Sequence, residues 1–96
     1  MKTIKLVDRV GSFAENKDKA KKLRTEELMP LLKMGEDITL DFNGIDAATQ
    51  SFVHALISDL FRMHGEEILN RVTFKNCNET VKKIISIVSD YMQEAD

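Results

Sequence analysis

Residues 40–56, LDFNGIDAATQSFVHAL, change their pattern of apolar residues partway along the stretch. Leu40 and Phe42 alternate with polar neighbours, which is typical of a strand with one buried face. After a turn rich in small residues, Phe52 and Leu56 recur at the spacing of a helix face. The stretch therefore predicts a strand, a turn and a helix in immediate succession.

Residues 72–75 show the same alternation, residues 4–7 show it in part, and a helical pattern follows each strand. Strands are predicted over residues 4–7, 38–42 and 72–75. Helices are predicted between the first two strands, over about 50–64 and from Asn78 onward. The order is β-α-β-α-β-α. Because helical crossovers join strands that run in the same direction, the sheet should be parallel with right-handed connections.

The helix between the first two strands has two candidate starts and an internal proline. Ser12 has capping-box spacing to a glutamate, and Asn16 is an equally good cap. Pro30 should kink this helix or restart it near Met29. Gly35 should end it.

Polar residues in the two clearest strands decide how many layers the fold has. Strands covered on both faces are apolar throughout, whereas these strands have polar residues at alternate positions, namely Thr39, Asp41, Thr73 and Lys75. We therefore predict an α/β fold with two layers, a right-handed βα superhelix. Its small parallel sheet, with strands in the order 1-2-3, would have all helices on one face, that of Ile38, Leu40, Phe42, Val72 and Phe74. On the other face, Asp41 could pair with Lys75. The last helix should bury Val81, Ile84, Ile85, Val88, Tyr91 and Met92.

Length and composition limit the possible classes of protein. The 96 residues, 43% of them apolar, predict one domain over residues 1–96. The net charge of −2 gives no general attraction to nucleic acid, and there is no apolar run long enough to span a membrane. The one cysteine, Cys77, excludes an internal disulfide and is interpreted as a half-buried structural residue. We expect a cytoplasmic protein that binds neither nucleic acid nor membrane.

Residues 17–24 form a basic stretch, with five cations against one anion. We interpret this stretch as the solvated face of the first helix, and a basic docking patch is the alternative. No aromatic residue lies among these charges, so nucleic-acid bases would have nothing to stack on.

Ser51, His54, Ser58 and Arg62 fall in one narrow stripe of the 50–64 helix, opposite its apolar face. Ser51 has no G-x-S-x-G elbow around it that would expose a nucleophile. His54 and His64 would point to different sides of the helix, with no cluster of further metal ligands. We therefore expect no enzymatic activity, no metal and no cofactor. The stripe is either a solvated helix face or a contact surface.

The carboxyl ends of the strands should form one edge of the sheet, together with the N-termini of the helices. Helix N-termini favour negative charge, so this edge is suited to an anion. A ligand there would contact Asn43, Gly44, Asn76 and Asn78. The alternative function is therefore a small nucleotide-binding domain or an enzyme that uses this edge.

Four segments together resemble one family of proteins. They are LDFNGID (40–46), TQSF (49–52), GSFAENKD (11–18) and FKNCNETV (74–81). They resemble the STAS-like family of small bacterial domains of unknown function, distant relatives of the sulfate-transporter and anti-sigma-factor-antagonist (STAS) domain. The resemblance covers nearly the whole chain. It implies a right-handed βα superhelix, although the antagonists begin with an additional strand that has no counterpart among the strands predicted here.

The resemblance also implies a function. Antagonists dock on a kinase-like ATPase and are released when a serine or threonine at the start of the second helix is phosphorylated. Where they read Asp-Ser-Ser/Thr-Gly, this chain has Thr49-Gln50-Ser51-Phe52, so Ser51 keeps the second hydroxyl and is the candidate phospho-acceptor. The alternative role of Ser51 is to accept hydrogen bonds from backbone N–H groups in the first turn. We expect a non-enzymatic regulatory or adaptor domain that docks on a protein partner, with its oligomeric state left open. The partner-docking residues would be Asp46, Thr49, Gln50, His54, Ser58 and Arg62.

Overall fold

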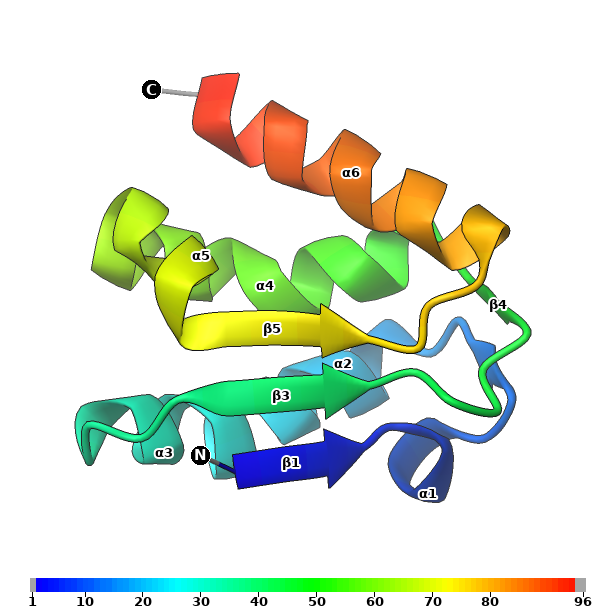
Figure 1. Cartoon of the computed structure of the whole chain (residues 1–96), viewed down its shortest axis with the longest axis horizontal. Helices are drawn as coiled ribbons and strands as arrows, with labels where there is room; N and C mark the ends of the chain where they lie inside the picture. The colour runs from blue at the N-terminus through cyan, green and yellow to red at the C-terminus, as the bar shows by residue number, and fades with distance from the viewer. Residues whose placement is uncertain (1, 95–96) are drawn as a thin grey trace.

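A parallel three-stranded sheet forms the centre of the computed structural model, which describes residues 2–94 (Figure 1). The strands β1 (Lys2–Lys5), β3 (Ile38–Asp41) and β5 (Val72–Lys75) lie side by side in that order, and both pairs are parallel. The predicted strand order and direction are confirmed. β1 begins two residues earlier than predicted, and the chain after it turns into a short helix, α1 (Val7–Val10).

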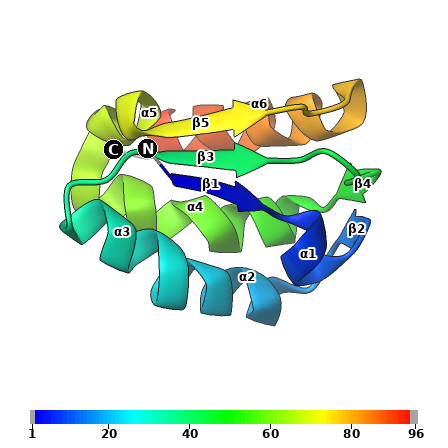
Figure 2. The same cartoon turned by 60° about the horizontal axis from the view of Figure 1, so that its bottom comes forward.

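Helices cover one face of the sheet, as Figure 1 and Figure 2 together show. The first group is α2 (Lys17–Leu23), the π-helical turn η1 (Arg24–Leu28) and α3 (Met29–Lys33). The second group is α4 (Gln50–His64), the 3₁₀ turn η2 (Gly65–Glu67) and α5 (Ile68–Arg71), and the last helix is α6 (Glu79–Glu94). α4 lies between α2 and α6 and packs against both. The predicted two-layer arrangement is confirmed.

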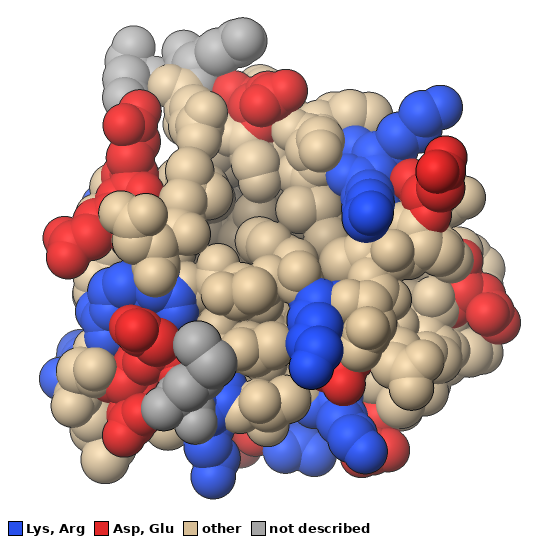
Figure 3. All heavy atoms as spheres, in the orientation of Figure 1, with Lys and Arg blue, Asp and Glu red and all other residues tan. Residues whose placement is uncertain are grey.

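The two faces of the sheet differ in polarity, as the alternating strands predict. Leu40 is fully buried toward the helices. On the other face, the strand register aligns Lys5, Asp41 and Lys75 in one row and three threonines in a second row. Figure 3 views this outer face and shows charges of both signs around a mostly uncharged centre.

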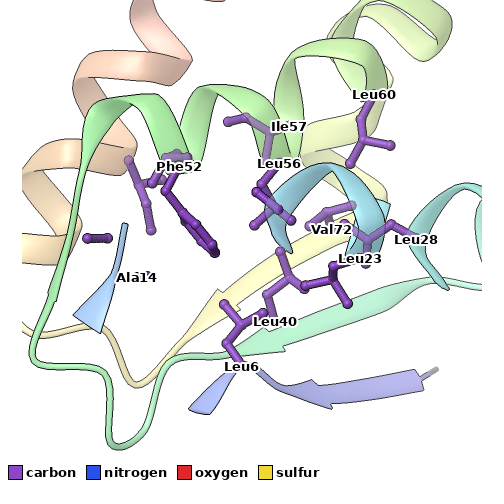
Figure 4. Close-up of a cluster of buried hydrophobic side chains, with 14 of the residues drawn as sticks. Leu6, Ala14, Leu23, Leu28, Leu40, Phe52, Leu56, Ile57, Leu60 and Val72 are labelled. Atoms are coloured by element: carbon purple, nitrogen blue, oxygen red, sulfur yellow. The ribbon is translucent and has the colours of Figure 1, made fainter. Parts of the chain in front are cut away.

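The core lies between the sheet and α4 (Figure 4). Phe52, Leu56 and Leu60 of α4 are fully buried, as are Leu40 of β3 and Leu6, which follows β1. Burial of a side chain of this size stabilises the fold by roughly 1.5–3 kcal/mol. These contacts hold α4 firmly on the sheet and so fix the direction in which its opposite side faces.

Asn16 caps α2, and the alternative capping box at Ser12 is wrong. The Asn16 side-chain oxygen accepts hydrogen bonds from the backbone N–H groups of Asp18, at 2.9 Å, and Lys19, at 3.1 Å. The segment after Ser12 is extended instead of helical, because Phe13–Ala14 form the short strand β2. The start of α2, and therefore the direction of its side chains, is set by Asn16.

The helix restarts at Met29, as Pro30 predicts. Pro30 has no backbone N–H and is the second residue of α3, so the helix continues past it without the hydrogen bond that this position would otherwise donate. The turn before it, η1, is wound more widely, as a π-helix, and begins at Arg24. Single π-helical turns often occur at functional sites. Gly35, with φ of +85°, follows the end of α3 as expected.

A second, smaller sheet was not predicted. β2 pairs in parallel with β4 (Ala47–Ala48). Beyond this pair, the Thr49 N–H donates to the Ala14 carbonyl at 3.0 Å. The small sheet thereby holds the first turn of α4 at the edge formed by the carboxyl ends of the main strands.

Buried apolar side chains among residues 2–94 form one continuous cluster. The domain predicted over residues 1–96 also includes Met1, Ala95 and Asp96, which lie outside the described residues. Within residues 2–94, no helix has the length and apolar character needed to cross a membrane.

Candidate functional site

A groove of about 850 Å³ runs over α4 on the side away from the sheet. α4 forms its floor, and the two helices packed against α4, α2 and α6, form its walls. Besides Ala55 and Asp59, the floor residues are Gln50, Ser51, His54, Ser58 and Arg62. All five belong to the predicted phosphorylation and docking residues, and the structure brings them together with two helices that are distant in sequence.

The α2 wall of the groove is cationic. Lys17 and Lys21 of α2 and Arg24, the first residue of η1, line it, and their spacing places them on one side of the continuous helix. The other two cations of the basic stretch, Lys19 and Lys22, are exposed and do not line the groove. The interpretation as a solvated face therefore fits Lys19 and Lys22, whereas the three groove residues form part of a concave surface.

Arg24 joins the α2 wall to the floor. Its Nη1–H donates to the Ala55 carbonyl at 2.6 Å, and its Nη2 lies 3.1 Å from Oδ2 of Asp59. The Arg24 side chain is only 13% exposed. Asp59 also forms an ion pair with Arg62 at 3.2 Å. Asp59, the single carboxylate among the described residues that line the groove, is therefore shared between two guanidinium groups.

Ser51 is exposed at the second position of α4 and does not cap the helix. The cap is Thr49, whose hydroxyl oxygen accepts a hydrogen bond from the Phe52 N–H at 3.1 Å. The alternative capping role of Ser51 is therefore wrong, because Thr49 fills it. Thr49 and Asp46, two of the predicted docking residues, do not line the groove.

The middle of the floor is not a solvated helix face. Ser58 is only 5% exposed, so it offers a partner little surface. His54 is half-buried, and its ring centre lies 6.3 Å from that of Tyr91, with the rings tilted by 58°. The four residues of the stripe predicted from sequence do lie together in the groove. A partner could contact mainly Ser51 and Arg62 at the ends of the stripe and the His54 ring between them.

The α6 wall is apolar and exposed. Ile87 is 49% exposed and Tyr91 is 62% exposed. The assignment of Tyr91 to the buried stripe of this helix is therefore wrong. α6 packs against α4 mainly through the inner part of its apolar surface, where Val88 is buried. Ile87 and Tyr91 extend past that contact and face the groove.

The groove is more positive than the protein as a whole. Among the described residues that line it, four side chains are cationic and one is a carboxylate, whereas the whole chain has a net charge of −2. A concave surface that gathers one sign of charge attracts ligands of the opposite sign.

At the edge where the strands end, Asp41 uses the groups that were predicted to hold an anion. The Asp41 carboxylate accepts hydrogen bonds from the Asn43 N–H and the Asn76 side-chain amide, both at 2.9 Å. The hydrogen bond from Asn76, then that from Asn43, lower the pKa of this carboxyl below its ordinary value, and Lys75 and Lys5 lower it further. Asp41 lies in register with Lys75, but it is only 9% exposed because it stands on the central strand.

Asn78 and Gly44 also have structural roles at this edge. Asn78 caps α6, since its side-chain oxygen accepts a hydrogen bond from the Val81 N–H at 2.8 Å, and its amide donates to the Asp46 carbonyl at 2.8 Å. Gly44 has φ of +88°, and a Cβ added there would lie 3.2 Å from the Val7 side chain. The residues predicted to form a ligand edge do lie close together. The polar groups of the three asparagines, however, are used in hydrogen bonds within the protein.

Two other candidate chemistries find little support in the structure. Within residues 2–94, no group of three or more His, Cys, Asp or Glu side chains is placed to hold a metal ion. Cys77 is half-buried, and this burial raises the pKa of its thiol. A protonated thiol is a poor nucleophile, which agrees with a structural cysteine.

Comparison with known proteins identifies the family. The family described as STAS-like domain of unknown function (DUF4325) matches residues 19–82, which is more than half of the chain. The matched range contains the whole floor of the groove as well as β3 and β5, whereas Ile87 and Tyr91 lie beyond it. No curated protein and no solved structure gives a match. The fold of parallel strands connected through helices on one face agrees with the family match. That match, over residues 19–82, shows that the chain belongs to the family of STAS-like domains of unknown function.

Proposed function

We propose that this protein is a non-enzymatic regulatory or adaptor domain that docks on a protein partner through the groove over α4. The main observation in favour is that exposed apolar side chains, Ile87 and Tyr91, stand across the groove from a cationic wall. Large apolar side chains exposed beside polar and charged ones are typical of protein interfaces. The proposal includes action in the cytoplasm, as the single cysteine and the lack of a long apolar run led us to expect.

Docking is favoured over nucleotide binding at the edge where the strands end. A phosphate there would compete with the Asp41 carboxylate for the Asn43 and Asn76 donors. Because the pKa of Asp41 is lowered, this carboxylate is charged at neutral pH and would repel the phosphate. The groove has the opposite balance of charge and more accessible apolar surface.

Phosphorylation of Ser51 would control the docking. Ser51 is exposed at the start of a 15-residue helix, where added negative charge costs the fold little. A phosphate adds about −1.5 to −2 charges at neutral pH. In the same groove as Lys17 and Lys21, it would offset their positive charge and obstruct the partner. By similarity to the STAS antagonists, the proposed partner is a kinase-like ATPase.

Affinity purification from the native host, with variants matched in charge, tests the docking proposal. Tagged wild-type protein should capture a partner that Lys17→Glu/Lys21→Glu loses, because these lysines line the groove. The control is Lys19→Glu/Lys22→Glu, which makes the same change of charge on the same helix outside the groove. The control should retain the partner. Equal loss or equal retention by the two variants would contradict docking at the groove.

The proposed control by phosphorylation has its own test. Phosphopeptide mapping of protein taken from the host should find phosphate on Ser51. Ser51→Asp should weaken capture of the partner, and Ser51→Ala should not. If no phosphate is found and Ser51→Asp binds the partner as the wild type does, the switch is refuted while docking stands.

A further inference from the structure

We infer that the segment of the partner that occupies the groove is an amphipathic α-helix with an acidic flank. This inference rests on the proposed docking function and adds the chemistry and conformation of the partner. It follows from the shape of the groove, from the satisfied backbone of its walls and from the distribution of charge between them.

The groove has the dimensions of a helix-binding site. α4 lies between α2 and α6, and packed helices are about 8–10 Å apart, so the walls stand roughly 16–20 Å apart from axis to axis. Because each wall helix extends about 5–6 Å from its own axis, a bound helix about 10–12 Å in diameter would rest on α4 and on the rims of both walls. From Ser51 to Arg62 the floor is about 16 Å long, which matches roughly three turns of a bound helix.

The backbone of the groove favours a helix over an extended segment. The floor and both walls are helices, whose backbone N–H and C=O groups are paired internally except at the ends. An extended segment laid in the groove would therefore leave its own backbone groups without partners on that side. A helix brings a satisfied backbone and presents only side chains, as in other proteins that recognise a helix in a groove.

The charges of the groove select an acidic flank. Asp59, its only carboxylate among the described residues, already pairs with Arg24 and Arg62. Lys17 and Lys21 are exposed on the α2 wall of the groove. Carboxylates one helical turn apart on the occupant would lie opposite these two lysines, which are themselves one turn apart.

The opposite wall selects an apolar stripe. Ile87 and Tyr91 are also one turn apart, and both are about half exposed or more. The His54 ring lies against Tyr91 and continues the surface toward the floor. Apolar residues of the occupant at helical spacing would cover this wall while its acidic flank faces α2.

Selection from an unbiased display library of peptides of about 16 residues tests the inference, with the full chain as bait. Enriched peptides should combine apolar residues at helical spacing with Asp and Glu beside them, and they should become helical on binding. Lys17→Glu/Lys21→Glu and Tyr91→Ala should each weaken binding about tenfold or more. Lys19→Glu/Lys22→Glu should change binding less than about twofold. Amide chemical shifts should change along the groove.

The other outcomes separate this inference from the proposed function. Enriched peptides that map to the groove but are basic, uncharged or extended would overturn the inference and leave docking intact. If no peptide is enriched, or if the peptides map elsewhere, both would be overturned. Phosphatidylglycerol vesicles and a single-stranded RNA oligonucleotide should not bind. Binding of either that is lost in Lys17→Glu/Lys21→Glu would assign the groove to another class of ligand and overturn the inference.

Discussion

Arg24→Ala should weaken the contact between the α2 wall and the floor of the groove and destabilise the fold. The lost hydrogen bond to the Ala55 carbonyl, 2.6 Å long and donated by a charged group, accounts for about 1.5–3 kcal/mol. The ion pair with the partly exposed Asp59 adds up to about 1 kcal/mol. The Arg24 Nε–H is buried without an acceptor among the described residues, which offsets roughly 1 kcal/mol of this gain. The net loss should be about 2 kcal/mol of unfolding free energy.

Urea denaturation followed by circular dichroism measures this loss. A decrease of about 2 kcal/mol corresponds to a fall in Tm of about 8–16 °C for a domain of this size. Arg24→Lys should recover part of it, because a lysine can keep one of the two contacts. Lys22→Ala, at an exposed position of the same helix, should stay within about 0.5 kcal/mol of the wild type. A loss below about 0.5 kcal/mol in Arg24→Ala would refute the anchoring role of this side chain.

Three further predictions concern the cap, a turn and the edge of the sheet. Asn16→Ala should lower the unfolding free energy measured in urea by about 1 kcal/mol, whereas Ser12→Ala should cost less than about 0.5 kcal/mol, and equal losses would contradict the assigned cap. Gly44→Ala should cost about 1–3 kcal/mol, because it combines φ of +88° with a close contact to Val7; an unchanged Tm would argue against this turn. Because the pKa of Asp41 is lowered in the fold, its carboxylate stabilises the protein above the unfolded pKa near pH 4, and this stability is lost as the pH falls through the lower folded pKa. Asp41→Asn should therefore reduce the loss of stability in acid, and the same pH dependence in both proteins would show that Asp41 does not contribute.

The layers of the fold could be predicted because single residues decide them. Alternating polar residues such as Thr39 and Asp41 are incompatible with helices on both faces, which left one arrangement of three parallel strands. Pro30 and Gly35 marked helix boundaries that are set by local chemistry alone. Strand alternation and helix boundaries depend on residues that are close together in the sequence, so both could be predicted from the sequence alone.

The groove could be predicted only in part, because it depends on contacts between distant helices. The helical period placed Ser51 and Arg62 on one stripe, but it could not show that neighbouring helices bury Ser58 in the middle. The spacing of Lys17 and Lys21 was a usable signal for a basic wall, although no local feature showed that this wall borders α4.

Two errors have the same physical origin. The assignment of Tyr91 to the core followed from the width of an apolar stripe, whereas burial depends on how much of α6 the neighbouring helix covers. β2 and β4 are each two residues long, too short to produce a periodic pattern, and they form only because the tertiary fold brings them together.

Photo-crosslinking in the native host tests docking at the groove most directly. Benzoylphenylalanine in place of Tyr91 keeps an aromatic ring on the exposed α6 wall, and the same residue in place of Thr73 reports on the outer face of the sheet. The proposed function predicts a crosslink from position 91 to one protein partner, and none to that partner from position 73. A partner crosslinked from position 73 but not from position 91 would contradict it.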